Sequence, residues 1–215
     1  MNSFCQSIHK LMNQSTRYDF HFSEKYIPKN GIYILFEKNE VSHGVDRIVR
    51  VGTHTGQNQL LSRIKQHFLN KNKDRSIFRK NIGRAILNKE KDNFINSWDI
   101  DLTSIKNKIL FKDQIDLEYQ KKIEDRVSQY MKTNFSFCCF EVENKKDRLI
   151  FESRLISTIS RCNECLGNEG WLGNDSPKEK IRKSGLWLVN ELYKEPLSKL
   201  EYKELSSLIE NGSRF

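Results

Sequence analysis

Proline and glycine are scarce in this sequence, and long apolar runs are missing. Three prolines and ten glycines stand among 215 residues, so no stretch has the composition of a flexible linker or a low-complexity repeat. No apolar run approaches the roughly 20 residues that a membrane-spanning helix needs. A chain of this length fits one core with insertions better than two cores. We therefore expect a single domain over residues 1–215 and no membrane partner.

Disulfide and secretion features are also lacking. Five cysteines, an odd number in a long chain, favour free thiols and a reducing compartment. The opening residues MNSFCQSIHKLMNQ lack the apolar centre and cleavage site of a secretion signal. We therefore expect a cytoplasmic protein. Cys162 and Cys165 have a zinc-like spacing. The adjacent pair Cys138 and Cys139 cannot complete a four-cysteine site with them, because adjacent strand residues point to opposite faces.

Positive charge, by contrast, is in excess. Lysine and arginine number 37 against 28 aspartates and glutamates, which gives a net charge of +9 and a pI near 9.3. Such a balance favours polyanions, because each neutralised phosphate releases condensed counterions. Many soluble proteins are equally basic for no specific reason, so the placement of the charges has to decide.

Three segments have the pattern of β-strands. Residues 31–36, GIYILF, form an apolar run typical of a buried strand, and residues 47–52, RIVRVG, form a second one. The polar segment 37–46 between them predicts a turn, so the pair is expected to be an antiparallel hairpin. Residues 135–143, FSFCCFEVE, are the third strand candidate.

Helical periodicity follows the hairpin and returns after the third strand. Ser176, Pro177 and Glu179 have the spacing of a capping box, which predicts the start of a helix. Asp74 is the expected N-cap of an earlier, basic helix. The predicted helices lie at about residues 57–70, 74–89, 116–131, 147–161, 176–193 and 197–209.

Glu152 stands out on the predicted helix 147–161. Its direction falls inside the apolar arc formed by Leu155, Ile156 and Ile159. A carboxylate on an apolar face is costly unless a metal, a cation or hydrogen bonds satisfy it. A metal ligand and a structural ion pair with a buried arginine both fit this position.

Arg63 and His67 lie four residues apart, on one side of the predicted helix 57–70. This side borders the apolar stripe, so both groups can reach a cleft at the edge of the core. A guanidinium suits phosphate binding and a histidine suits proton transfer, although ordinary surface residues give the same pattern. Tyr33 lies mid-strand, where a tyrosine usually belongs to the core. A nearby metal or arginine can lower the pKa of a phenol enough for it to act as a base.

Four basic residues crowd the short predicted helix 74–89. We expect this helix to contact nucleic-acid phosphates mainly without regard to sequence. The residues concerned are Arg75, Arg79, Lys80 and Arg84.

Several of these features occur in one order along the chain. GIY at 31–33, RVG at 50–52, Arg63 with His67, and FESRLIST at 151–158 together resemble the GIY-YIG nuclease superfamily. The resemblance implies an α+β fold with a small three-stranded antiparallel sheet flanked by helices. The core would span about 30–90 and 135–162, with a helical insertion at about 91–134 and a C-terminal helical extension at about 170–215.

The resemblance also implies a Mg²⁺-dependent endonuclease that acts on DNA, with Mn²⁺ as a possible substitute. Glu152 would be the lone protein ligand of the metal. Tyr33 would position or deprotonate the attacking water, Arg63 would stabilise the transition state, and His67 would assist at the phosphate. An asparagine that usually follows the glutamate helix has its preferred match in Asn168.

The sequence departs from the family pattern at Arg50, which replaces the tyrosine of the second motif. Arginine cannot act as a base near neutral pH. Strict alternation puts Arg50 on the same strand face as Ile48 and Gly52, where it could hold the scissile phosphate or lower the pKa of Tyr33. His54, just beyond the strand, is a possible replacement proton acceptor.

Three functional classes stay open at the level of sequence. The first is a restriction-type endonuclease, for which a homodimer is possible. The second is a repair or recombination nuclease that reads DNA structure, and the third is a non-catalytic nucleic-acid-binding module. The joint presence of Tyr33, Arg63, His67 and Glu152 favours the two catalytic classes.

Overall fold

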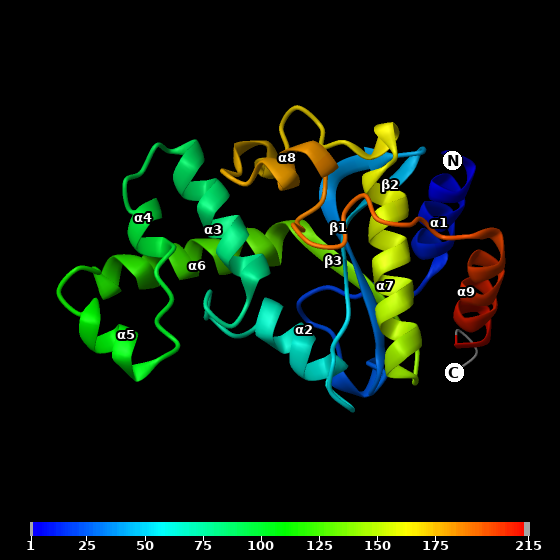
Figure 1. Ribbon diagram of the computed structural model, residues 1–215, viewed down its shortest axis with the longest axis horizontal. Coiled ribbons are helices and arrows are strands. Elements are labelled where there is room, and N and C mark those ends of the chain that lie inside the picture. The colour runs from blue at the N-terminus through cyan, green and yellow to red at the C-terminus, as the bar shows by residue number, and fades with distance from the viewer. Residues whose placement is uncertain (1, 213–215) are drawn as a thin grey trace.

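A three-stranded antiparallel sheet forms the centre of the protein. The computed structural model describes residues 2–212 (Figure 1). Its strands are β1 (Gly31–Ser42), β2 (Val45–Gly52) and β3 (Phe135–Glu141), in the spatial order β2-β1-β3. Helices cover the sheet, so the predicted α+β fold is confirmed.

The β1–β2 hairpin is longer than the sequence predicted. Its turn is His43–Gly44 instead of the polar segment 37–46, and both turn residues have positive φ angles, 54° and 76°. Two such residues in succession are typical of a type I′ hairpin turn. The prediction was wrong because two acidic side chains of the segment, Glu37 and Glu40, are buried with partners. Glu40 pairs with Arg47, and Glu37 accepts a hydrogen bond from Nε1 of Trp187 at 2.8 Å.

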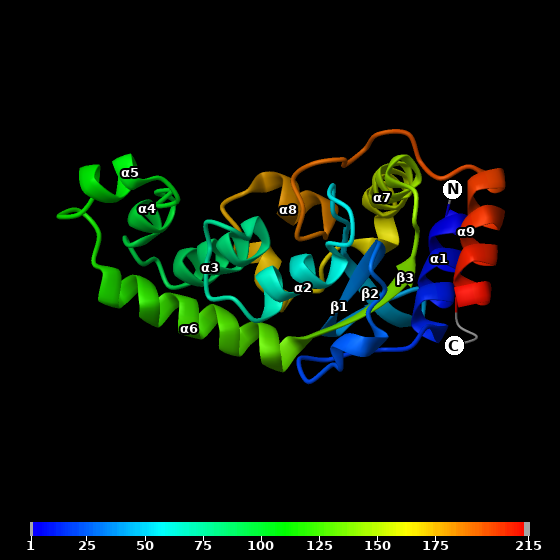
Figure 2. The ribbon, with the colours of Figure 1, turned by 90° about the horizontal axis from the view of Figure 1, so that it is seen from below.

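Each face of the sheet is covered by its own set of helices. Side chains such as Ile32 and Ile34 pack against α1 (Asn2–Gln14), α7 (Lys145–Ser160) and α9 (Lys199–Gly212). Figure 2 shows α1 and α9 side by side next to α7. Tyr33 and Leu35 belong to the opposite face, which packs against α2 (Leu60–Phe68) and α3 (Ile77–Lys89). Helix α1 was not predicted, although Cys5, Ile8 and Met12 form a buried stripe on it.

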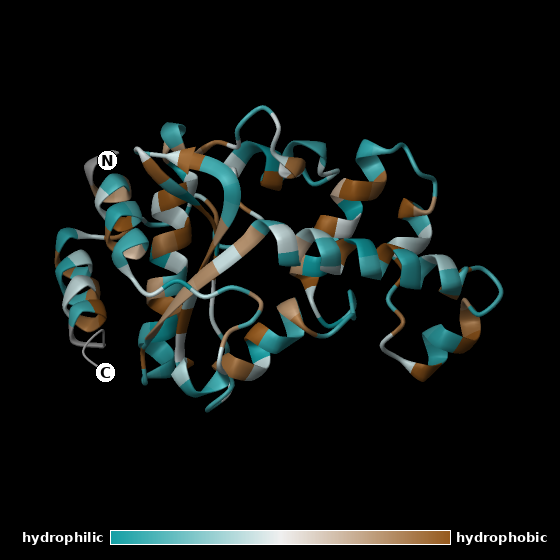
Figure 3. Cartoon of the chain, turned by 180° about the vertical axis from the view of Figure 1, so that it is seen from behind, coloured by the Kyte–Doolittle hydropathy of each residue, from teal (hydrophilic) through white to brown (hydrophobic). Residues whose placement is uncertain are grey.

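The predicted insertion extends away from the sheet as an arm. It contains α4 (Ile95–Trp98), α5 (Ile105–Leu110) and α6 (Leu117–Asn134), and α6 runs directly into β3 (Figure 1). In the hydropathy colouring of Figure 3, β3 is largely brown whereas much of α6 is teal. Nε1 of the buried Trp98 donates to the Lys80 carbonyl oxygen at 2.9 Å, which fastens the base of the arm to α3.

The C-terminal half contains less helix than predicted. A short helix, α8 (Glu179–Ser184), stands where the sequence predicted 176–193. It ends at Gly185, whose φ of 68° is the left-handed conformation that terminates helices. Beyond it, the Trp187 amide donates to the Val49 carbonyl oxygen at 2.8 Å, beside the edge of β2. The 3₁₀ turns are η1 (Glu24–Tyr26), η2 (Asn163–Cys165) and η3 (Leu172–Asp175). In the described part of the chain, no helix has the length and apolarity to cross a membrane.

The basic helix α3 is mostly internal. Its N-cap is Ser76, not Asp74. Arg79 is fully buried and forms an ion pair with Glu124 of α6 at 2.7 Å. Lys80 and Arg84 are also buried, and their charged groups bind Asp74 and Asp99, respectively. The burial of these three basic residues argues against their predicted phosphate contacts, whereas the contact of the exposed Arg75 stays a prediction.

The Arg79–Glu124 pair gives a direct test of this packing. Glu124→Gln leaves the buried guanidinium without its counter-charge, so we expect the free energy of unfolding to fall by about 3 kcal/mol. The adjacent Asp125 pairs with Lys71 at the surface, and Asp125→Asn should cost less than about 1 kcal/mol. Urea denaturation of both variants measures the difference, and equal losses would contradict the buried pairing.

Candidate active site

Tyr33 and Gly52 face each other across the hairpin. They are direct partners in the β1–β2 register, and the phenol of Tyr33 lies over the glycine. A Cβ atom at position 52 would stand 2.2 Å from the Tyr33 hydroxyl oxygen. The glycine of RVG is therefore required by the close approach of this side chain.

A chain of hydrogen bonds starts at the buried Tyr33 hydroxyl. It lies 2.8 Å from Nε2 of His67, and Nδ1 of His67 lies 2.7 Å from Oγ of Ser76. Ser76 also caps α3 by accepting from the Arg79 amide. Burial holds the pKa of His67 well below its usual range, and the charge of Arg50 lowers it further. His67 is therefore neutral at ordinary pH, with one donor and one acceptor nitrogen.

Arg50 reaches this chain through a β-bulge. The register pairs Leu35 with Arg50 but Phe36 with Ile48, so Val49 is an extra residue on β2. The bulge places Arg50 on the face of Tyr33 while Ile48 packs on the other face. Strict alternation was therefore the wrong expectation for this strand, and bulges commonly re-aim side chains in this way. Nε of Arg50 is 3.5 Å from the Tyr33 hydroxyl.

Glu152 approaches the same region from α7. The side chain is partly buried, and its Oε1 accepts a hydrogen bond from the Thr53 amide at 3.0 Å. Burial raises the pKa of the Glu152 carboxyl, against the opposing charge of Arg50 and the Thr53 hydrogen bond. Arg50 itself donates to the Trp187 carbonyl oxygen, and Arg63 donates to Gln66 at 3.1 Å. Both guanidinium groups thus act on Glu152 through space.

An open pocket of about 300 Å³ lies where β2 ends. Arg63, partly exposed on α2, and Thr53, which binds Glu152, both line it. The position suits a phosphate group, because Arg63 lines the pocket and a guanidinium binds phosphate well. The lining residues are Thr53, His54, Thr55, Gln59, Ser62, Arg63 and Gln66.

His54 also lines the pocket, but both of its ring nitrogens are engaged. Nδ1 lies 2.7 Å from the Gly56 carbonyl oxygen and must donate to it, while Nε2 accepts from the Gly31 amide at 3.2 Å. Burial lowers the pKa of His54. These bonds fasten the loop after β2 to the start of β1, and they leave no lone pair for a water proton.

Asn168 contacts the part of β1 that contains Asn39 and Glu40. Its side chain donates to the Asn39 carbonyl oxygen at 2.7 Å, and its amide donates to Glu40 at 3.1 Å. The structure thus places Asn168 by these backbone and carboxylate contacts instead of beside Glu152. Its predicted phosphate contact stays a prediction.

Sequence reasoning missed two residues that organise the site, Ser76 and Thr53. The signal for Ser76 was its position before the first apolar residue of α3, which is the usual place of an N-cap. Thr53 binds Glu152 through its backbone amide, and no sequence pattern reveals such a contact.

Gly52→Ala tests the close approach to Tyr33. The added methyl group displaces the phenol from His67, so we expect the free energy of unfolding to fall by about 1–3 kcal/mol. Gly170→Ala is the control, because a Cβ there meets nothing within 4 Å; its effect should stay within about 0.5 kcal/mol. Thermal or urea unfolding measures both variants. Indistinguishable stabilities would contradict the packing of Tyr33 on Gly52.

Comparison with known protein families agrees with this arrangement, in which a β-hairpin is followed by a helix with Arg63 and His67 and later by a helix with Glu152. The family profile described as GIY-YIG domain matches residues 1–214. No curated protein and no solved structure gives a significant match. Because the profile spans nearly the whole sequence, the chain belongs to the GIY-YIG domain family.

Proposed function

We propose that this chain is a metal-dependent endonuclease that hydrolyses DNA phosphodiester bonds. Membership in a family with a nuclease-type fold supports the general class. The observation that carries the proposal is Glu152, a carboxylate under the influence of Arg50 and Arg63 that the Thr53 amide binds just after the end of β2. Two arginines, a carboxylate and a hydrogen-bonded Tyr–His pair can supply the electrostatic stabilisation and proton transfer that phosphodiester hydrolysis uses.

The donor set fits Mg²⁺. Oε1 of Glu152 is held by the Thr53 amide, and Oε2 is the oxygen that could bind a hard cation. The raised pKa of Glu152 indicates a carboxylate that gains from a nearby positive charge. One carboxylate suffices for Mg²⁺, which keeps several waters, and Mn²⁺ can use the same oxygen ligand. When bound, the ion would neutralise charge on the phosphate oxygens and lower the pKa of a bound water.

Tyr33 is the proposed general base, and His67 holds its oxygen in place. Burial and the charges of nearby arginines oppose protonation of His67, so the neutral ring serves as a hydrogen-bond partner, and the proton of the attacking water goes to the deprotonated oxygen of Tyr33. Nε of Arg50, 3.5 Å from the Tyr33 hydroxyl oxygen, places a positive charge beside the oxygen that would take this proton. Arg63 stands in the open pocket, where it can bind the phosphate as charge develops.

DNA beyond the scissile phosphate would be contacted by the arm α4–α6 and by exposed basic residues such as Arg75. Incubating the protein with varied DNAs and Mg²⁺, and mapping the ends of any cut products, tests the proposal and distinguishes the three functional classes. Fixed cut positions at one sequence would identify a restriction-type enzyme. Cuts at junctions or branches would identify a repair or recombination nuclease, and intact DNA despite binding would identify a non-catalytic module.

Glu152→Gln should abolish cleavage while DNA binding and folding persist. Removing the charge removes the metal ligand, and we expect a loss of at least about 10³-fold in rate, equivalent to several kcal/mol. Asp147→Asn, an exposed change on the same helix, is the matched control and should cut normally. Gel-based cleavage and fluorescence anisotropy measure the two properties. Normal cutting by Glu152→Gln would contradict the metal assignment.

The choice of base is tested by Tyr33→Phe against His54→Asn. The phenylalanine ring still packs but lacks the hydroxyl, so the cleavage rate should fall about 10²-fold or more. His54→Asn should mainly reduce stability, because its bonds fasten a loop.

The pH profile of wild-type cleavage adds a second readout. The lowered pKa of His67 keeps it neutral, so no inflection is expected near pH 6.5, and activity should still rise above pH 8. As pH falls through the raised pKa of Glu152, protons compete with Mg²⁺ and the apparent metal affinity should drop. A plateau from about pH 7 together with an inactive His54→Asn would assign the base to His54.

A further inference from the structure

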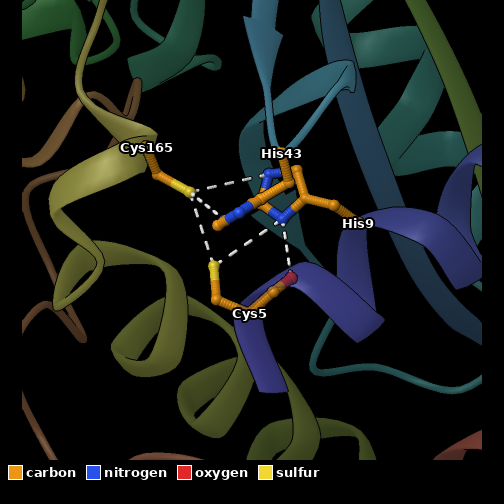
Figure 4. Close-up of side chains that lie close together, drawn as sticks. All are labelled: Cys5, His9, His43 and Cys165. Carbon is orange, nitrogen blue, oxygen red and sulfur yellow. Dashed lines mark hydrogen bonds between the residues drawn. The ribbon is translucent and has the colours of Figure 1, made fainter. Parts of the chain in front are cut away.

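Four side chains with metal-ligating atoms meet at a second place in the molecule (Figure 4). Cys5 and His9 come from α1, His43 from the β1–β2 turn, and Cys165 from η2 after α7. All four ligand atoms lie within 4.8 Å of one another. The three segments are far apart in sequence, and they belong to the side of the sheet that α1 and α7 cover.

The spacing of these atoms matches a tetrahedral zinc site. Sγ of Cys165 lies 3.4 Å from Sγ of Cys5, 3.5 Å from Nε2 of His43 and 3.8 Å from Nε2 of His9. With Zn–S bonds of about 2.3 Å and Zn–N bonds of about 2.0–2.1 Å, neighbouring ligand atoms of a tetrahedral site are about 3.3–3.8 Å apart. The cluster therefore needs only small shifts to surround one ion.

The two histidines are oriented by their other ring nitrogens. Nδ1 of His43 lies 3.2 Å from Oε2 of Glu164, and Nδ1 of His9 lies 2.9 Å from the Cys5 carbonyl oxygen. Both oxygens can only accept, so each Nδ1 carries the proton and each Nε2 presents a lone pair towards the thiols. A carboxylate or carbonyl behind the distal nitrogen is the usual support of a metal-binding histidine.

Burial and backbone geometry set this cluster apart from an ordinary polar surface. Cys5, His9 and Cys165 are 1%, 0% and 0% exposed, and the His43 side chain is 2% exposed although it belongs to a hairpin turn. His43 has a φ of 54°, a left-handed conformation that is uncommon outside glycine. Hairpin turns of this type usually carry asparagine or aspartate at such a position. Here the residue is His43, and its imidazole points into the protein.

We propose that Cys5, His9, His43 and Cys165 bind a structural Zn²⁺ ion. Four protein ligands in a closed site are the arrangement of structural zinc, and thiolate with imidazole ligands select zinc over Mg²⁺. Binding would release the thiol protons of Cys5 and Cys165 to solvent. The ion would join α1, the hairpin turn and the segment after α7, independently of the proposed metal at Glu152.

Two contacts bear on whether His9 or Cys162 is the fourth zinc ligand. Nε2 of His9 also accepts from the Ile48 amide at 3.2 Å, a bond that zinc would replace. Sγ of Cys162 lies 3.5 Å from Nε2 of His43, so this thiol is the alternative ligand. Loss of zinc in His9→Asn with retention in Cys162→Ser supports the proposed set. The reverse result would overturn the assignment of His9.

The first experiment is elemental analysis of the full chain, expressed with added zinc and dialysed into zinc-free buffer. We expect about one Zn²⁺ per chain, and loss of that zinc in Cys165→Ser and His43→Asn. Cys139→Ser is the matched control, because this cysteine lies outside the cluster; it should keep the ion, as should Glu152→Gln. Wild-type protein without bound zinc, or ligand variants that keep it fully, would overturn the proposal whatever the nuclease activity.

A measurement on the unchanged chain covers the case in which the ligand variants do not fold. Replacing zinc by Co²⁺ should give the visible absorption of tetrahedral cobalt with thiolate ligands. Removing the metal with a strong chelator should lower the Tm by roughly 10 °C, because the ion binds only the folded state. An octahedral cobalt spectrum and a Tm unaffected by the chelator would overturn the proposal, as would a Cys5–Cys165 disulfide in the purified protein.

Discussion

The hydroxyl group of Tyr33 lies in the interior, where a polar group without a partner costs about 1–3 kcal/mol. Its partner is His67, and His67 in turn requires a partner for its second nitrogen, which Ser76 supplies. These two linked hydrogen bonds fix the positions of α2 and of the first turn of α3 relative to β1. Gly52 completes this arrangement, because a Cβ at that position would occupy the space of the phenol.

The site forms at the edge of the sheet because β2 is an edge strand. Helices from both faces can reach past it, so Glu152 of α7 and Arg63 of α2 approach the end of the strand from opposite sides. The bulge at Val49 adds Arg50 to the face of Tyr33. The loop after β2 joins the two halves, since the Thr53 amide binds Glu152 and Thr53 also lines the pocket of Arg63.

The basic residues of the chain fall into two groups, those buried in the core and those exposed to solvent. Arg47, Arg79 and Arg148 are fully buried, and Arg47 and Arg79 neutralise internal carboxylates. These pairs leave the net charge unchanged, but they remove arginines from the side chains that could contact a polyanion. The net charge of +9 gives no information about this division, which depends on where each partner lies in the fold.

The sequence predicted the parts that depend on local pattern. The apolar runs of β1 and β2 and the stripe of α2 indicated the hairpin and the helix after it, and the ordered motifs indicated the sheet. Contacts between distant segments were not predictable in this way. Arg79 looked solvent-exposed because its partner Glu124 follows 45 residues later, and Cys5 and Cys165 are 160 residues apart. The bulge at Val49 was not predicted either, because the hydrophobic pattern of a short strand does not reveal a single extra residue.

The proposed role of Glu152 as the metal ligand can be tested directly by anomalous diffraction. Crystals of the slow variant Tyr33→Phe with DNA and Mn²⁺ would be measured at the manganese edge. We expect a manganese peak at about 2.0–2.2 Å from a Glu152 oxygen, in contact with a phosphate next to Arg63 and facing position 33. A manganese ion bound elsewhere, with Glu152 closed in an ion pair with Arg50 or Arg63, would contradict this role.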